Sequence, residues 1–225
     1  MVDLLEELRR KIVFNEYLPG SVLNVRELAK QFNVSPTPIR EALIRLESEM
    51  LVKRVPNKSV QVTELSLQDI RDIFEARFTL TDTVAILATD RITREQLKRM
   101  GELIALMRDE TDRSKLLQLD YLVHNLLGEA TGNEVIAGML RTLRNQVTRL
   151  WLFVGETDEY SISRVTEFEE IKAALEQGRT EQVRQLLRKH IREFADLVAK
   201  ALVAPHTLLV ATEKRNAGAK GLTQS

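Results

Sequence analysis

Asp120, His124 and His190 are the side chains in this sequence best suited to holding a metal ion. Asp120 and His124 are four residues apart, so a helix presents an oxygen and an imidazole on one side, within reach of one cation. His190 falls in an apolar helical stripe nearer the end of the chain. The alternative is three hydrogen-bonded core side chains, because any buried polar group needs a partner. The spacing alone leaves both interpretations open.

Two arginines occupy inward-facing positions of predicted helices. Arg77 lies in an apolar stripe, where its guanidinium can hold a carboxylate through two parallel hydrogen bonds. An internal salt bridge, for example with Asp120, is the alternative. Arg149, close to Trp151, allows the same two interpretations. Arg77 and Arg149 are therefore candidates for binding a small carboxylate.

A metal-dependent hydrolase built on the helical region is the alternative function class. The sequence contains no His-Glu-x-x-His pattern, no glycine-rich phosphate loop and no cysteine. No further base accompanies Asp120 and His124 in the pattern that such catalysis requires. We therefore predict no catalytic residues and no enzyme activity.

The side chains after residue 64 must be positioned by helices. Residues 57–204 contain no proline, and the 225-residue chain is 44% hydrophobic and 29% charged, which favours regular helix. Six amphipathic stretches with short connections predict an antiparallel bundle over residues 65–204, whose interior is a natural ligand site. The stretches begin at a Ser66–Asp69 capping box and continue at 93–110, 115–130, 133–154, about 163–176 and 180–203. Residues 205–225 are small and polar and are predicted to form a flexible tail.

Residues 1–64 follow a different pattern, in which short helices precede a hairpin. Apolar spacing predicts helices over 4–13 and 26–32, and a third helix begins after Ser35, a favourable N-cap followed by Pro36. Two β-branched runs, 51–55 and 60–63, then predict a hairpin. This order is that of a winged helix-turn-helix, whose third helix can lie in the DNA major groove. A small structural α+β domain without a ligand is the alternative.

Charge and hydropathy exclude several other classes. The 33 basic and 33 acidic residues cancel, yet seven basic and four acidic residues lie between Arg26 and Lys58. Net charge therefore conceals a modest local basic bias. No stretch approaches the roughly 18 apolar residues of a membrane span, and the first 20 residues lack the apolar core of a signal peptide. We expect a cytoplasmic protein.

The N-terminal region resembles the DNA-binding domain of the GntR family of bacterial transcription regulators. The resemblance covers residues 4–64, and its most specific part is Val34-Ser-Pro-Thr-Pro-Ile-Arg-Glu-Ala-Leu43. It implies DNA contacts at five positions, which are Arg26, Ser35, Thr37, Arg40 and Lys58. The arginines would pair with guanine and the hydroxyls would bind phosphates. The sequence departs from the family at Pro36, where an arginine is usual, and at Ser59, where the wing tip usually has glycine.

The C-terminal region resembles the FCD effector domain of the FadR subfamily of these regulators. The matching residues are Arg77, Asp120 with His124, the run from Ala130 to Asn133, and His190. Many members bind a divalent metal, of the zinc or nickel class, through one Asp and three His. The resemblance therefore implies Asp120, His124 and His190 as metal ligands and Arg77 and Arg149 as effector-binding residues.

Phe168 stands where the family has its middle histidine, 22 residues before the last. A phenylalanine cannot ligate, so at most three protein ligands remain. Two outcomes are open: a cation held by those three ligands with water or an effector carboxylate, or a metal-free site in which Phe168 forms an apolar wall. Thr81 similarly replaces a glutamate that the family often has four residues after Arg77.

Together these features predict a mainly α, ligand-responsive transcriptional regulator. It is expected to act as a homodimer, because a monomer makes too few contacts for useful specificity and dimer symmetry matches a pseudo-palindromic double-stranded operator. Repression is the favoured mode, and the effector is expected to be a small organic acid bound in the helical bundle.

Overall fold

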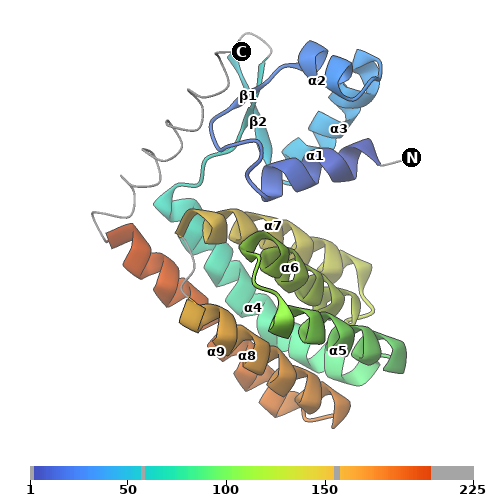
Figure 1. Ribbon diagram of the computed structural model, residues 1–225, viewed down its shortest axis with the longest axis vertical. Coiled ribbons are helices and arrows are strands. Elements are labelled where there is room, and N and C mark those ends of the chain that lie inside the picture. The colour runs from blue at the N-terminus through green and yellow to red at the C-terminus, as the bar shows by residue number, and fades with distance from the viewer. Residues whose placement is uncertain (1–2, 57–58, 155–157, 204–225) are drawn as a thin grey trace.

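The computed structural model describes residues 3–56, 59–154 and 158–203. Lys58, one of the expected DNA contacts, and the expected tail over 205–225 lie outside these residues. The described chain folds as an N-terminal winged helix followed by a helical bundle (Figure 1). The predicted mainly α fold is confirmed. None of the described helices combines the length and the apolar character that crossing a membrane requires.

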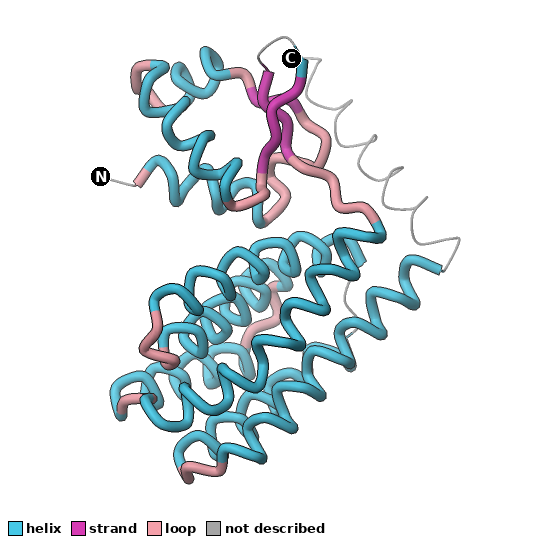
Figure 2. Tube along the Cα trace, turned by 180° about the vertical axis from the view of Figure 1, so that it is seen from behind, coloured by secondary structure: helices cyan, strands magenta, loops and turns pink. Residues whose placement is uncertain are grey.

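The winged helix consists of three helices and a small antiparallel sheet, shown in magenta in Figure 2. In chain order its elements are α1 (Leu4–Val13), β1 (Val22–Leu23), α2 (Val25–Gln31), α3 (Pro36–Ser48), β2 (Val52–Val55) and β3 (Ser59–Val62). β2 and β3 form the predicted hairpin, and β1 adds to the other edge of β3, giving the order β1-β3-β2. The sequence did not predict β1, because a two-residue strand is too short to show alternation.

The core of the winged helix fixes the orientation of α3. Ile39, Leu43 and Leu46 are buried against apolar residues of α1 and the sheet. A left-handed backbone at Asn33, with φ 52°, makes the turn from α2 into α3. The opposite face of α3 is consequently turned to solvent.

Within the described residues, six helices form the bundle, as the sequence predicted. They are α4 (Leu67–Arg91), α5 (Arg94–Asp109), α6 (Arg113–Glu129), α7 (Glu134–Val154), α8 (Asp158–Glu176) and α9 (Thr180–Val203). Ser66 and Asp69 form the expected capping box, and glycines with positive φ, Gly132 and Gly178, lie in the turns before α7 and α9. α8 begins at Asp158, earlier than the expected residue 163.

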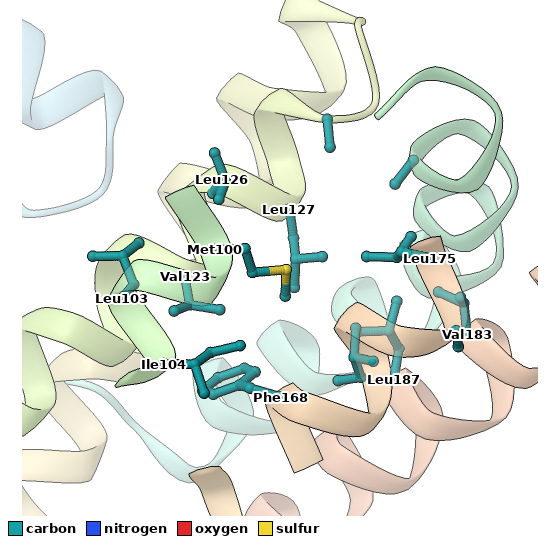
Figure 3. Close-up of a cluster of buried hydrophobic side chains, with 14 of the residues drawn as sticks. Met100, Leu103, Ile104, Val123, Leu126, Leu127, Phe168, Leu175, Val183 and Leu187 are labelled. Carbon is teal, nitrogen blue, oxygen red and sulfur yellow. The ribbon is translucent and has the colours of Figure 1, made fainter. Parts of the chain in front are cut away.

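One apolar cluster of the bundle has buried residues from α4, α5, α6, α8 and α9, and Leu140 of α7 packs against it. Phe168 is fully buried in it and lies beside Ile104 in the apolar cluster of Figure 3. A second cluster, which includes Phe74, Trp151 and Phe194, joins α4, α7 and α9. α7 also packs against α1, so this helix belongs to the bundle and to the boundary with the winged helix at once.

Candidate functional site

The exposed face of α3 and the start of α2 form the candidate DNA-binding surface. Arg26, Ser35, Thr37 and Arg40, the four described residues expected to bind DNA, are all exposed. Arg40 follows the buried Ile39 directly, so burial of one side of α3 turns this guanidinium outward. The surface offers cations and hydroxyls of the kinds that bind guanine and phosphate.

Ser35 is the N-cap residue of α3, as expected, but its hydroxyl makes no capping hydrogen bond. The expected acceptance from the amides of the first turn is therefore absent. Pro36 and Pro38 have no N–H, which leaves Thr37 as the first amide donor of the helix. A hydroxyl and an amide at a helix N-terminus make a suitable place for a phosphate oxygen.

A groove of about 400 Å³ runs between α3 and the wing. Arg40 and Arg54 line it, together with Ile44 and Glu47. Arg54 donates to Glu47 across the groove, with 3.0 Å between Nε and Oε2. The sequence analysis did not name Arg54 as a candidate DNA-binding residue. Its place in a short strand of the predicted wing is the signal that could have identified it.

Asp120, His124 and His190, the three residues expected to bind metal, meet in the centre of the bundle. The Nε2 atoms of the two histidines are 3.1 Å apart, and Asp120 Oδ1 is 3.9 Å from His124 Nε2. α6 supplies the first two residues and α9 supplies His190. Asp120 and His190 are almost inaccessible to solvent.

Two buried arginines that the sequence did not indicate hold the carboxylate of Asp120. Arg164 of α8 donates from Nε to Oδ1 at 2.9 Å, and Arg144 of α7 pairs with Oδ2. Arg164 lies four residues before Phe168 and therefore on the same helix face. That spacing is the signal that could have identified it, whereas Arg144 depends on how α6 and α7 pack.

The hydrogen bonds around His190 define the state of both imidazoles. His190 Nδ1 lies 2.6 Å from Glu167 Oε2 and donates to it, so Nε2 of the same ring accepts. His124 and Arg164 lie 3.1 and 3.4 Å from that nitrogen and can both donate to it. Burial is the main cause that lowers the pKa of both histidines well below the usual value, and nearby arginines lower it further. Both rings are therefore neutral near pH 7.

A cavity of about 60 Å³ adjoins this cluster and is lined by residues of α4, α6, α7 and α9. His124 and His190 form part of its wall, and the charged residues among the described lining are Arg77 and Arg144. Thr81 also lines the cavity, and its hydroxyl donates to the backbone oxygen of Arg77 at 2.8 Å. The wall therefore combines apolar side chains with cationic donors, which suits a small anion.

Phe168 packs against both rings of the histidine pair. Its ring centroid is 5.3 Å from that of His124 and 5.4 Å from that of His190. Within the described residues, no three or more His, Asp and Glu side chains are arranged to hold a metal ion. The site has the form of a buried polar network beside an apolar wall.

Arg149, the second residue expected to bind the effector, lies at the boundary with the winged helix and is not among the residues that line the cavity. Its Nη1 donates to Thr63 Oγ1 at 2.9 Å and to Gln146 Oε1 at 2.8 Å. Burial lowers the pKa of Arg149 to about 10, so the side chain remains charged near neutral pH. Its hydrogen bonds tie α7 to the segment that follows the wing.

Gln146, a neighbour of Arg149 on α7, binds the backbone immediately after α3. Its Nε2 donates to the backbone oxygens of Glu49 and Met50, at 3.3 and 3.1 Å, immediately after α3 ends at Ser48. Glu49 in turn receives two 2.7 Å hydrogen bonds from Arg9 of α1. Gln146 was not predicted, because a buried glutamine in an amphipathic helix looks like any other core polar residue.

Comparisons with known proteins show which family has this architecture. The profile of the "FCD domain" family matches residues 72–193, and that of "Bacterial regulatory proteins, gntR family" matches residues 2–62. The chain is 28% identical over 172 residues to YdhC of Bacillus subtilis, an uncharacterized HTH-type transcriptional regulator, covering 72% of this chain and 77% of YdhC. It is 25% identical over 194 residues to the HTH-type transcriptional repressor RspR of Escherichia coli, covering 85% of each.

Among solved structures, E. coli McbR/YncC has a similar fold. The TM-score is 0.78 at 21% identity, covering 89% of this chain and 99% of the other. None of these three proteins is a hydrolase by name, so the hydrolase alternative gains no support. Because the FCD profile alone matches more than half of the chain, the chain belongs to the FCD-containing branch of the gntR family, a family of DNA-binding transcriptional regulators.

Proposed function

We propose that this protein is a repressor whose DNA binding is controlled by a small carboxylate held in the bundle. It acts as a homodimer on a pseudo-palindromic operator, in the cytoplasm where the chromosomal DNA lies. It works by binding and not by catalysis. The observation that carries the proposal is the double attachment of α7, which lines the cavity through Arg144 and holds the winged helix through Gln146 and Arg149.

The DNA contacts are assigned by exposure and chemistry. Arg40 and Arg26 read base edges, because a guanidinium can donate twice to one guanine. Ser35 and Thr37 hold a backbone phosphate at the N-terminus of α3, where the Ser35 hydroxyl is not used for capping. Lys58 reaches DNA from the wing. Each contact is made twice in a dimer, which gives the specificity that one recognition helix lacks.

The effector is a carboxylate because the charged residues of the described cavity wall are both cationic. Arg77 and Arg144 can each donate to a carboxylate oxygen, and the neutral imidazoles of His124 and His190 add polar contacts. Most of the remaining wall is apolar, through Val84, Leu127, Leu140, Leu187 and Ile191, which favours a ligand with a short hydrocarbon part.

Coupling follows from the competition for Arg144. In this structure Arg144 is paired with Asp120. An effector carboxylate that takes over this guanidinium changes the attachment of α7 to α6. Arg144 and Gln146 are two residues apart and so point to opposite sides of α7, which carries any shift of the helix to the end of α3. A useful switch needs a coupling free energy of about 1–3 kcal/mol, or about 5–150-fold in DNA affinity.

A two-step experiment tests this function. Short mono-, di- and tricarboxylates, such as acetate, lactate, succinate and citrate, are first screened for those that raise the thermal midpoint, because a ligand of the folded state stabilises it. Binding to DNA from the protein's own upstream region is then measured with and without each stabilising acid. We expect specific DNA binding that Arg40→Ala weakens and that the acid weakens in the wild type. Absence of specific DNA binding would overturn the regulator function.

Gln146→Ala separates effector binding from the response. The variant keeps every residue of the cavity and loses the two hydrogen bonds to the end of α3. We expect an unchanged thermal shift with the acid but a reduced effect of that acid on DNA affinity. Leu122→Ala, an exposed position on α6, is the matched control and should behave as the wild type. Equal responses of all three proteins would remove α7 from the coupling.

A further inference from the structure

The positions of the atoms around Asp120 test whether the metal implied by the family resemblance fits this chain. A metal needs imidazole lone pairs that converge on it and a carboxylate oxygen directed at it. The two histidine Nε2 atoms do lie close together, 3.1 Å apart. The oxygens of Asp120, however, are directed at Arg164 and Arg144. The acidic ligand is therefore already engaged by two cations.

The guanidinium of Arg164 also spans the gap that a metal would bridge. Its Nε is 2.9 Å from Asp120 Oδ1, and its Nη2 is 3.4 Å from His190 Nε2. One planar group thus joins the oxygen and the nitrogen that a metal would join. An arginine keeps its positive charge in proteins, so a divalent cation at this place would meet a like charge at short range.

Arg164 is held in place from several sides. Its guanidinium carbon lies 5.5 Å from the ring centroid of Trp151 and 6.0 Å from that of Phe194, within the range of cation–π attraction. Its side chain is 4% exposed. This residue of α8 has a partner on each of α6, α7 and α9. Its charge is therefore held in a fixed position at the centre of the bundle.

Phe168 lies one helical turn after Arg164 on α8 and is the second residue that departs from a metal site. It stands where the family has its middle histidine, and its fully buried ring packs against both imidazoles. Arg164 and Phe168, on one face of α8, therefore supply a cation and an apolar wall where the family resemblance implies a metal and one of its ligands.

We propose that Arg164 is a fixed positive charge that replaces the metal, so that this protein binds its carboxylate through arginines and neutral imidazoles, without a metal. The metal fits poorly because its acidic ligand is taken and its place is occupied by a cation. The inference deepens the proposed function and rests on it only for the class of ligand. Metal independence is a property of the purified protein and can be measured without any effector.

The wild-type chain gives the first test. Full-length protein is incubated with Zn²⁺ or Ni²⁺, desalted and analysed for metal, and its thermal midpoint is measured with added metal or with EDTA. We expect metal far below one equivalent per chain and the same midpoint in every condition. One retained equivalent, or a midpoint that EDTA lowers, would overturn the inference while leaving the regulator function standing. A carboxylate screen without a hit would contradict the proposed effector class and leave the metal-free site standing.

A pair of variants tests whether Arg164 is the cause. The double variant Arg164→Ala with Phe168→His removes the guanidinium and restores the family's fourth ligand. We expect it to bind one Zn²⁺ per chain by calorimetry and to be stabilised by Zn²⁺. The matched control, Phe168→His alone, keeps Arg164 and should bind Zn²⁺ at least tenfold more weakly.

Equal Zn²⁺ affinity of the two variants would show that Arg164 does not exclude the metal and would overturn the inference. A double variant that is folded by circular dichroism and still rejects Zn²⁺ would overturn it as well. If the double variant does not fold, the wild-type metal content decides the matter by itself.

Discussion

The winged helix and the bundle use the same side chain, arginine, in opposite surroundings. Arg26 and Arg40 are exposed on the winged helix, where water solvates their charge and where we propose that a DNA phosphate or base replaces that water. Arg144 and Arg164 are buried in the bundle, where a charge must be paired to be tolerated, and both pair with Asp120. An exposed arginine is open to an external partner, whereas a buried one must be neutralised within the fold.

Removing the shared carboxylate should expose this difference most strongly. Asp120→Ala leaves Arg144 and Arg164 buried without their common anion, and breaking a buried ion pair costs about 3–5 kcal/mol. We expect a loss of that size in the free energy of unfolding, measured by urea denaturation. A loss no greater than that of an exposed aspartate would contradict the assigned role of the buried pair.

An exposed arginine should affect affinity and leave stability unchanged. Arg40→Ala is expected to weaken operator binding by about 1–3 kcal/mol, or about 5–150-fold, because it removes a base contact. Its urea transition should coincide with that of the wild type. Lys98→Ala, which removes an exposed charge from α5, is the control for general charge effects. Equal DNA affinities for the Arg40 and Lys98 variants would exclude α3 as the surface that contacts the DNA bases.

The neutral histidines of the bundle should make its stability depend on pH. Burial lowers the pKa of His124 and His190 in the folded state, whereas in the unfolded chain they take up protons near pH 6.5. Below that pH the unfolded state binds more protons, so the free energy of unfolding falls as pH falls, until the folded pKa is reached. Each histidine contributes about 1.4 kcal/mol per pH unit.

His124→Gln isolates that contribution. Its unfolding free energy is followed by urea denaturation from about pH 7 to about pH 5. Below about pH 6.5 the slope should be smaller than that of the wild type by up to about 1.4 kcal/mol per pH unit. The comparison between the two proteins cancels the titration of the carboxylates. Parallel pH profiles would mean that His124 is already charged in the folded state.

The smallest effect is expected at a surface ion pair of the bundle. Asp82 accepts two hydrogen bonds from Arg188, at 2.8 and 2.7 Å, and both side chains are partly exposed. Asp82→Ala should lower the free energy of unfolding by less than about 1 kcal/mol, because solvent screens such pairs. The same measurement provides the reference for Asp120→Ala. A loss of several kcal/mol would show that exposure does not govern these pairs.

The sequence predicted the parts of this fold that depend on local patterns. The six helices of the bundle, the Ser66–Asp69 capping box and the β2–β3 hairpin all follow from periodicity, capping and turn residues within short windows. The strand β1 was not predicted, because a two-residue strand is too short to show an alternating pattern. The capping bond expected of Ser35 is absent although the helix begins where predicted, because Pro36 fixes that start independently.

The candidate site was only partly predictable, for a physical reason. Helical spacing placed Asp120, His124 and His190 on inward faces, and these three residues do meet. Which cation neutralises Asp120 depends on how helices far apart in sequence pack, so Arg144 and Arg164 could not be named. Arg149 illustrates the same limit: an inward position on α7 can face the bundle interior or the winged helix, and it faces the winged helix.

The central claim is that an acid bound among buried arginines changes DNA binding at the exposed ones. One measurement tests this claim directly. Operator affinity is determined by fluorescence anisotropy for the wild type and for Gln146→Ala, each without and with a carboxylate that raises the thermal midpoint of both. We predict a change of about 5–150-fold in the wild type and a much smaller change in the variant. Operator affinity that is the same with and without every stabilising carboxylate would contradict the claim.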